Sequence, residues 1–224
     1  MSAAMPPAPH SAEPVVFIVD DDAALRASLS SLLRSCGFRV ADYASGAGFL
    51  AAALPDCPCC LLLDVRLQGA SGLDFQAELA RRRIDLPIVF MTGHGDIPMT
   101  VRAMKAGAVD FLAKPFREQD LLDAVAAALA RDGERRASAS AAGELAARYA
   151  GLTPREREIM GLAASGLMNK QIAGQVGTSE ITVKIHRANA MRKMQARTFA
   201  DLVRMAEALG LDISEARPGS YTRV

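Results

Sequence analysis

The stretch Cys60-Leu61-Leu62-Leu63-Asp64 decides the fold of this chain, because a short apolar run leads directly into one carboxylate. Such a run is typical of a buried parallel strand. A second apolar run, Val15 to Val19, ends in Asp20-Asp21-Asp22. Open α/β sheets bind ligands at the edge where the carboxyl ends of parallel strands meet. In the flavodoxin-like strand order, Asp20, Asp21 and Asp64 come together at that edge.

The chemistry of this edge follows from its charges. Carboxylates in close contact repel one another by about 4 kcal/mol at an effective dielectric constant of about 20, so the cluster requires a cation. Mg²⁺, a hard cation that prefers oxygen ligands, is the expected ion. Two further runs, 87–91 and 109–113, end in Thr92 and Lys114. A carboxylate nucleophile, a metal, a hydroxyl donor and an ammonium are the groups that phosphoryl transfer requires. The sequence therefore predicts that a phosphoryl group is received here.

Strand and helix patterns alternate from Val15 to about Ala130, which predicts a doubly wound, flavodoxin-like (βα)5 domain. Asp22 is the expected N-cap of the first helix, and Gly37 is expected to end it. The expected elements after that helix are, in chain order, a strand at 38–43, a helix at 47–54, the Asp64 strand, a helix at 73–83, the Thr92 strand, a helix at 98–106, the Lys114 strand and a helix at 118–130.

The segment 131–147 is rich in Ala, Ser, Gly and Arg, and it is either a flexible tether or a continuation of the preceding helix. Beyond it the pattern is helical throughout. Thr153-Pro154-Arg155-Glu156 is a capping box, and helices at 169–176 and 179–194 meet at a tight turn that contains Gly177. This arrangement predicts a helix-turn-helix, and a last helix at 199–209 completes an all-α four-helix unit.

These patterns divide the chain into a disordered tail at 1–13, an α/β domain at 14–130, a linker at 131–150, a helix-turn-helix domain at 151–211 and a second tail at 212–224. The charge divides similarly. Residues 1–143 carry 14 basic and 17 acidic side chains, a net charge of −3, and residues 144–224 carry 12 and 8, a net charge of +4. The acidic part suits a metal site, and the basic part suits an anionic partner.

Other sequence features exclude several classes of protein. The sequence has no run of about 18 apolar residues and no hydrophobic leader, so we expect a soluble cytoplasmic protein without membrane contact. Cys36, Cys57, Cys59 and Cys60 lack the spacing of a zinc site. We expect structural thiols, with redox sensing as the alternative.

Several stretches carry a resemblance to a known family. Thr92-Gly93-His94-Gly95-Asp96, Met104-Lys105-Ala106-Gly107-Ala108 and Lys114-Pro115-Phe116 are similar to FixJ-type receiver domains. The segments 166–173 and 182–187 resemble StyR-like regulators. The chain is identified as a member of the FixJ/NarL class of two-component response regulators, which join a receiver to a LuxR-type helix-turn-helix.

The resemblance implies a role for each residue at the sheet edge. Asp64 would be the phosphoacceptor. The implied Mg²⁺ ligands are Asp20, Asp21, Asp64 and the backbone carbonyl of Arg66. Thr92 would hydrogen-bond the new phosphoryl group, Lys114 would neutralise it, and Phe111 would turn inward behind Thr92. The implied function is a transcription regulator and not an enzyme.

The resemblance also implies partners. These are a cognate sensor histidine kinase, double-stranded promoter DNA, a second copy of the chain after phosphorylation, and RNA polymerase. In the helix at 179–194, the spacing of Val183, Ala190 and Met194 predicts a buried face. The residues expected to contact DNA are Thr182, Lys184, Ile185, Arg187, Ala188 and Arg192.

Two alternatives remain open at this point. Gln68 stands where the family commonly has proline, so the receiver could act as a protein-binding module that works without phosphorylation. A phosphatase of the haloacid dehalogenase type would also place an aspartate nucleophile after an apolar strand. Those enzymes have a second aspartate two positions later, and here that position is Arg66.

Overall fold

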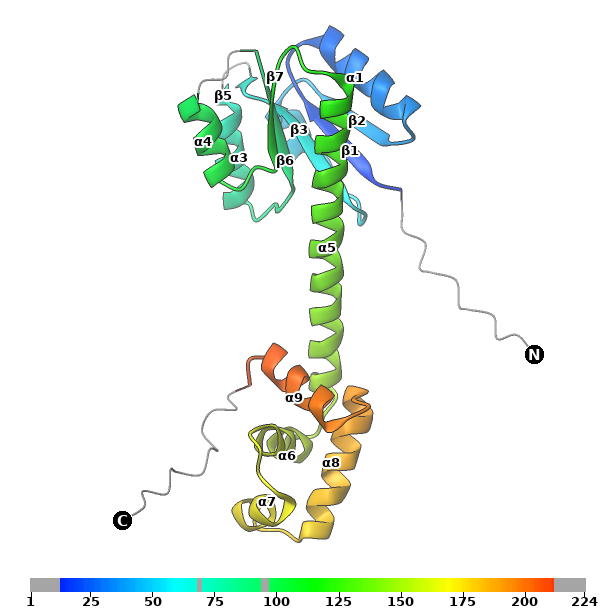
Figure 1. Ribbon diagram of the computed structural model, residues 1–224, viewed down its shortest axis with the longest axis vertical. Coiled ribbons are helices and arrows are strands. Elements are labelled where there is room, and N and C mark those ends of the chain that lie inside the picture. Colours follow the sequence, from blue (N-terminus) through cyan, green and yellow to red (C-terminus); the bar gives the residue numbers. More distant parts are fainter. Residues whose placement is uncertain (1–12, 68–69, 94–96, 212–224) are drawn as a thin grey trace, which may run out of the picture. The chain divides into compact units, whose positions relative to one another are not determined.

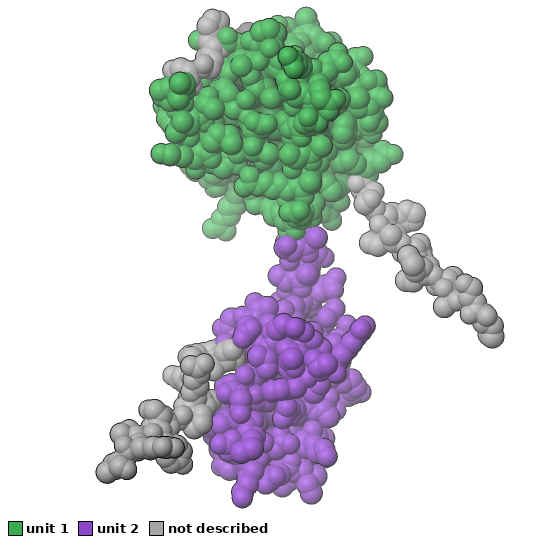
Figure 2. Space-filling model, viewed as in Figure 1, with its two compact units in different colours: residues 1–136 green, residues 137–224 purple. Residues whose placement is uncertain are grey.

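The structure is a computed structural model that describes residues 13–67, 70–93 and 97–211. The chain forms two compact units, 1–136 and 137–224, which Figure 2 shows in different colours. Each unit has its own hydrophobic core. The two predicted tails, apart from residue 13, lie outside the described residues, as do Gln68 and His94.

The first unit is built on a parallel sheet with the strand order β2-β1-β3-β6-β7. This order confirms the flavodoxin-like prediction, with the switch point between β1 and β3. The strands are β1 Val15–Val19, β2 Arg39–Tyr43, β3 Cys59–Asp64, β6 Ile88–Thr92 and β7 Asp110–Ala113. A short antiparallel pair, β4 Arg66–Leu67 and β5 Ala70–Ser71, follows β3 and was not predicted.

Helices cover both faces of this sheet (Figure 1). Alternate residues of each strand point to opposite faces, so Val16 and Ile18 of β1 pack under the first and last helices of the unit, whereas Phe17 and Val19 pack under the three helices between them. The helices are α1 Ala23–Ser35, α2 Gly46–Leu50, α3 Gly72–Arg81, α4 Ile97–Lys105 and α5 Glu118–Ala150. Asp22 caps α1 as predicted, since its carboxylate accepts hydrogen bonds from the backbone N–H groups of Ala24 and Leu25.

Two helices differ from the predicted extent by four residues or more at one end. Helix α2 ends at Leu50 instead of 54, and Pro55 disfavours the helical conformation at Leu54. Helix α5 continues to Ala150, far beyond the expected end at 130, so the predicted linker is helical. Alanine is the best helix former, and Gly133 and Gly143 cost only about 1 kcal/mol each.

The second unit contains the predicted helices, α6 Pro154–Ala164, α7 Asn169–Val176, α8 Glu180–Met194 and α9 Phe199–Ala208. The capping box at Thr153 is present, and Gly177 ends α7 with φ +66°, a conformation that favours glycine. Val183, Ala190 and Met194 form the buried face of α8, as predicted. This confirms a four-helix domain that contains a helix-turn-helix.

The cysteine side chains form no disulfide. Cys57, Cys59 and Cys60 are buried around the start of β3. The pKa of the Cys59 thiol is raised to about 12, mainly by burial and secondly by the neighbouring Cys57. This thiol therefore stays protonated at neutral pH. Within the described ranges, the helices are all too short or too polar to span a bilayer.

Candidate functional site

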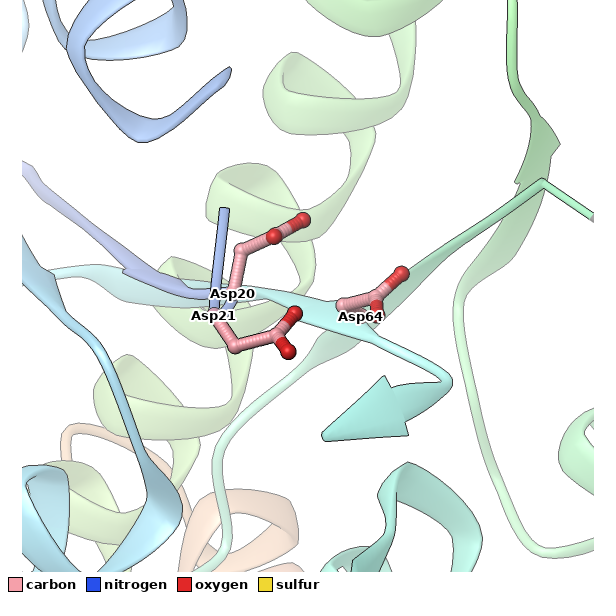
Figure 3. Close-up of side chains that lie close together, drawn as sticks. All are labelled: Asp20, Asp21 and Asp64. Carbon is pink, nitrogen blue, oxygen red and sulfur yellow. The ribbon is translucent and has the colours of Figure 1, made fainter. Parts of the chain in front are cut away.

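Three carboxylates meet at the carboxyl edge of the sheet, at the switch point between β1 and β3. Figure 3 shows Asp20, Asp21 and Asp64 with their side chains around one space, and one carboxylate oxygen of each lies within 4.8 Å of the others. Asp20 and Asp64 are buried, with exposed fractions of 1% and 6%. Ionised carboxylates in such a place need a counter-charge, because burial penalises the charged form.

Lys114 supplies part of that charge. Its Nζ atom donates to Asp20 Oδ2 at 2.7 Å and to Asp64 Oδ1 at 2.9 Å. Burial lowers the pKa of Lys114, but the hydrogen bonds to both carboxylates outweigh it and raise the pKa above its ordinary value. The pKa of Asp64 is also raised, first by burial and further by Asp20, against the lowering effect of Lys114. Lys114 alone therefore does not fully compensate the buried negative charge.

Thr92 is the last residue of β6, and Phe111 lies within β7, opposite Phe90 of β6. Thr92 is buried, and its backbone carbonyl accepts a hydrogen bond from the Lys114 N–H at 2.6 Å. Phe111 is half-buried, and its ring centroid lies 6.3 Å from that of Phe90 on the neighbouring strand. The sheet therefore brings the residues Thr92 and Lys114 to the edge that holds Asp64, whereas the Phe111 ring packs against the core next to that edge.

Backbone and side-chain contacts orient the carboxylates. Asp20 Oδ1 accepts the N–H of Asp22, and Asp64 Oδ2 accepts the N–H of Arg66 at 3.0 Å. Arg26 Nη1 donates to the backbone carbonyl of Asp20 at 2.7 Å. Arg26 was not among the residues predicted from the sequence. Its position one turn after the N-cap Asp22, beside the acidic run, is the sequence signal that could have identified it.

Gly72 allows α3 to begin directly against the end of β3, the strand that carries Asp64. A Cβ atom at this position would overlap the carbonyl oxygen of Asp64 and lie 3.0 Å from Val65 Cα, and the Gly72 N–H donates to Val65 O at 2.8 Å. Gly72→Ala is therefore expected to lower the free energy of unfolding by about 2 kcal/mol, because the backbone must shift. Urea unfolding measures this change.

Gly133→Ala is the matched control for Gly72→Ala. Gly133 lies in α5, and no atom outside its own helix turn lies within 4 Å of the place that an alanine Cβ would take, so alanine should raise the unfolding free energy by about 0.5 kcal/mol or more. A Gly72→Ala protein as stable as the wild type would show that the close approach to Asp64 imposes no requirement for glycine.

Helix α8 of the second unit presents a mixed basic and apolar surface. Ile181 and Ile185 are 74% and 55% exposed, and Lys184, Ala188 and Arg192 are exposed around them. Large aliphatic side chains exposed beside basic ones suit contact with thymine methyl groups and phosphates in a major groove. Ile181 was not among the predicted DNA contacts, although its spacing from Ile185 places both on one helical face.

Two of the predicted DNA contacts are partly enclosed. Thr182 is half-buried, and its N–H donates to the N-cap hydroxyl of Ser179. Arg187 is half-buried as well, and its Nη1 donates to Asn169 Oδ1 at 3.1 Å. The freely exposed side chains among the predicted contacts are therefore Lys184, Ile185, Ala188 and Arg192.

The sheet edge and the helix-turn-helix define a protein that joins a phosphoryl-receiving domain to a DNA-binding domain. Comparison with family models agrees: residues 16–126 match the response regulator receiver domain, and residues 150–206 match the bacterial regulatory proteins of the luxR family. The chain belongs to the response regulators of two-component systems, in the DNA-binding FixJ/NarL class. This is a family of transcription regulators, which removes the phosphatase alternative.

Individual relatives extend over most of the chain. Nodulation protein W of Bradyrhizobium diazoefficiens is 55% identical over 201 residues, which cover 90% of this chain and 88% of the relative. Response regulator protein TodT of Pseudomonas putida is 46% identical over 195 residues, covering 87% and 86%. The solved structure of the response regulator StyR, 48% identical, matches with a TM-score of 0.80 over 88% of this chain and 99% of that one.

Proposed function

We propose that Asp64 accepts a phosphoryl group from a sensor histidine kinase, and that this switches a promoter-binding transcription regulator. The observation that carries the proposal is the geometry of the Asp20, Asp21 and Asp64 carboxylates, whose oxygens lie within 4.8 Å of one another, with the ammonium of Lys114 shared by Asp20 and Asp64. This arrangement offers a nucleophile, ligands for a cation and a fixed positive charge at one point. Each is a requirement of phosphoryl transfer.

The donor set fits Mg²⁺. This ion prefers oxygen ligands, with one or two carboxylates, waters and phosphate oxygens. Asp20, Asp21, Asp64 and the backbone carbonyl of Arg66 would hold it, in the part of the cluster that Lys114 does not neutralise. Bound Mg²⁺ would reduce the repulsion between the carboxylates and the incoming phosphoryl oxygens.

The protein residues then act as follows. A carboxylate oxygen of Asp64 attacks phosphorus, the bond from phosphorus to the kinase imidazole nitrogen breaks, and its electron pair returns to the ring. Lys114, whose Nζ atom lies 2.9 Å from Asp64 Oδ1, neutralises the added charge. The hydroxyl of Thr92 donates to a phosphoryl oxygen, and Phe111 follows it inward. The rearrangement thereby reaches β7 and the neighbouring α4.

Phosphorylation is proposed to favour a homodimer that binds promoter DNA in the cytoplasm and contacts RNA polymerase. Helix α4 exposes Ile97, Val101 and Met104, an apolar surface that a second copy could cover. A dimer presents two copies of α8 to paired half-sites, with Lys184, Ile185, Ala188 and Arg192 facing the major groove and Thr182 near the helix start.

Intact mass spectrometry tests the proposal. The full-length protein is incubated with acetyl phosphate and Mg²⁺, with and without chelator, alongside Asp64→Asn and the control Asp74→Asn, which changes an exposed carboxylate on α3. The expected result is one phosphoryl adduct that depends on Mg²⁺ in the wild type and the control and is absent from Asp64→Asn. Ultracentrifugation and DNA binding of the same samples then show whether the adduct promotes dimers and affinity.

The opposite outcome has a specific meaning. If Asp64→Asn and the unmodified wild type bind DNA as tightly as the phosphorylated protein, the receiver does not control DNA binding through Asp64. The receiver would then act as a module that responds to a protein partner.

A further inference from the structure

Arg187 is held by two other helices of the DNA-binding unit. Its Nη1 donates to Asn169 Oδ1 at 3.1 Å, and its guanidinium carbon lies 4.2 Å from the centre of the Phe199 ring. Asn169 is the first residue of α7, and Phe199 is the first residue of α9. One side chain of α8 therefore contacts the beginnings of both neighbouring helices.

Phe199 occupies a central place in this unit. Its ring packs against both hydrophobic clusters, one formed mainly by α6, α8 and α9 and the other by α6, α7 and α8. A guanidinium over the face of an aromatic ring is attracted by the negative charge of that face. Arg187 therefore covers the ring that joins the two cores.

The other cationic side chains on α8 have different surroundings. Lys184 and Arg192 are exposed, and the only hydrogen bond found for Arg192 within the described part of the chain, 3.4 Å to Asn189, stays on the same helix. Lys193 is paired with Glu156 of α6 at 2.6 Å. Among these residues, Arg187 alone combines a cation–π contact with a hydrogen bond to the first helix of the helix-turn-helix.

We propose that Arg187 is a positioning residue, which acts on DNA by fixing the orientation of α8 against α7 and α9 and not by contact with the DNA itself. The proposal rests on the DNA-binding function proposed above. Sequence readout needs side chains such as Lys184 and Ile185 at defined places in the groove, whereas phosphate contacts carry no sequence information directly and supply nonspecific affinity through their charge. Loss of the contacts of Arg187 with Asn169 and Phe199 should therefore reduce sequence discrimination across a whole half-site and leave nonspecific binding nearly unchanged.

The test uses the full-length protein and two DNA duplexes. One carries the sequence that the wild type, treated with acetyl phosphate, selects from a random pool, and the other carries the same bases in scrambled order. Binding of wild type, Arg187→Gln, Arg187→Lys, Phe199→Leu and Lys184→Gln is measured over a series of salt concentrations, below the thermal transition of each variant. A wild type that selects no sequence would contradict the proposed function itself and not this inference.

Arg187→Gln should lose about tenfold in affinity for the selected duplex, keep its affinity for the scrambled duplex within about twofold, and keep the salt slope. Phe199→Leu should reproduce this loss without a change of charge. A double variant that combines Arg187→Gln with Phe199→Leu should lose little more than either single variant, because both changes break the same cation–π contact. Arg187→Lys, which keeps the charge near the ring, should recover part of the discrimination. Lys184→Gln should instead lower the salt slope by about one.

Direct contact predicts a different pattern. A phosphate contact by Arg187 would lower the salt slope of Arg187→Gln as in Lys184→Gln, and a base contact would relax discrimination at one base pair only. Either result, together with full discrimination by Phe199→Leu, overturns the proposal. If Arg187→Gln does not fold, the choice between positioning and direct DNA contact rests on three other variants, Arg187→Lys, Phe199→Leu and Asn169→Ala. Phe199→Leu and Asn169→Ala leave the net charge unchanged.

Discussion

Replacing Lys114 by methionine is expected to lower the free energy of unfolding of the first unit by about 3 kcal/mol in Mg²⁺-free buffer. The reason is that Asp20 and Asp64, both buried, lose the ammonium that hydrogen-bonds to each of them. Removal of one partner from a buried ion pair costs several kcal/mol, since the remaining charge stays in a poorly solvated place. Urea unfolding of the full-length protein, with chelator present, measures the loss.

Mg²⁺ should recover much of this stability in Lys114→Met. A ligand that binds only the folded state stabilises it by about 2.7 kcal/mol at a concentration of about 100 times its dissociation constant. Removal of a cation from the cluster should also strengthen Mg²⁺ binding. The rate of phosphoryl uptake from acetyl phosphate should nevertheless fall by about a hundredfold, because the lost ammonium is the one that neutralises the transferred group.

Lys105→Met is the control for Lys114→Met. Lys105 is exposed at the end of α4, so its replacement makes the same change in net charge away from the carboxylates. The unfolding free energy should stay within about 0.5 kcal/mol of the wild type. Equal stability of the Lys114→Met and Lys105→Met proteins in Mg²⁺-free buffer would contradict the view that Lys114 compensates buried charge.

The sheet edge could be predicted from the sequence because its information is local. Each strand is a short apolar run, and the polar side chains of the edge come where these runs end, as Asp64 follows Leu63. Parallel pairing then brings the ends of the runs together without any further information. The same holds for Thr153 and Gly177, whose capping roles depend on a few neighbouring residues.

Features that depend on distant residues could not be predicted. The helical course of 131–150 is an example, since its alanine-rich sequence suits a helix and its glycines suit a tether. The structure shows Asp132, in this segment, accepting a hydrogen bond from the backbone of Cys59, 73 positions away. The contacts of Arg187 with Asn169 and Phe199 likewise depend on how three helices pack.

Asp132→Asn is expected to destabilise the first unit by about 3 kcal/mol at neutral pH. Asp132 is fully buried on α5, and its carboxylate accepts hydrogen bonds from the Cys59 N–H at 2.9 Å, from Arg135 Nη2 at 2.6 Å and from Arg136 Nε at 2.7 Å. An asparagine leaves two guanidinium groups without their shared anion and turns an amide N–H₂ towards one of them. Urea unfolding at neutral pH measures this loss.

The pH dependence identifies the cause. Burial raises the pKa of Asp132, but the hydrogen bonds from Arg136 and Arg135 outweigh burial and lower the pKa below its ordinary value. A carboxyl group with a lowered pKa in the folded state contributes stability above its unfolded pKa of about 4, and that stability is lost as the pH falls towards the folded pKa. The difference between wild type and Asp132→Asn should therefore be constant near neutrality and shrink below a pH of about 4.

Other carboxylates do not disturb this comparison. Asp64 has a raised pKa, so its contribution to the pH dependence has the opposite sign, but it is present in both proteins and cancels in their difference. Asp123→Asn, which changes an exposed carboxylate on the same helix, should alter stability by less than about 0.5 kcal/mol at every pH. If the stability difference between wild type and Asp132→Asn is as large in acid as at neutral pH, the loss comes from packing. Protonation of Asp132 would then not remove the stabilising interaction that the variant has lost.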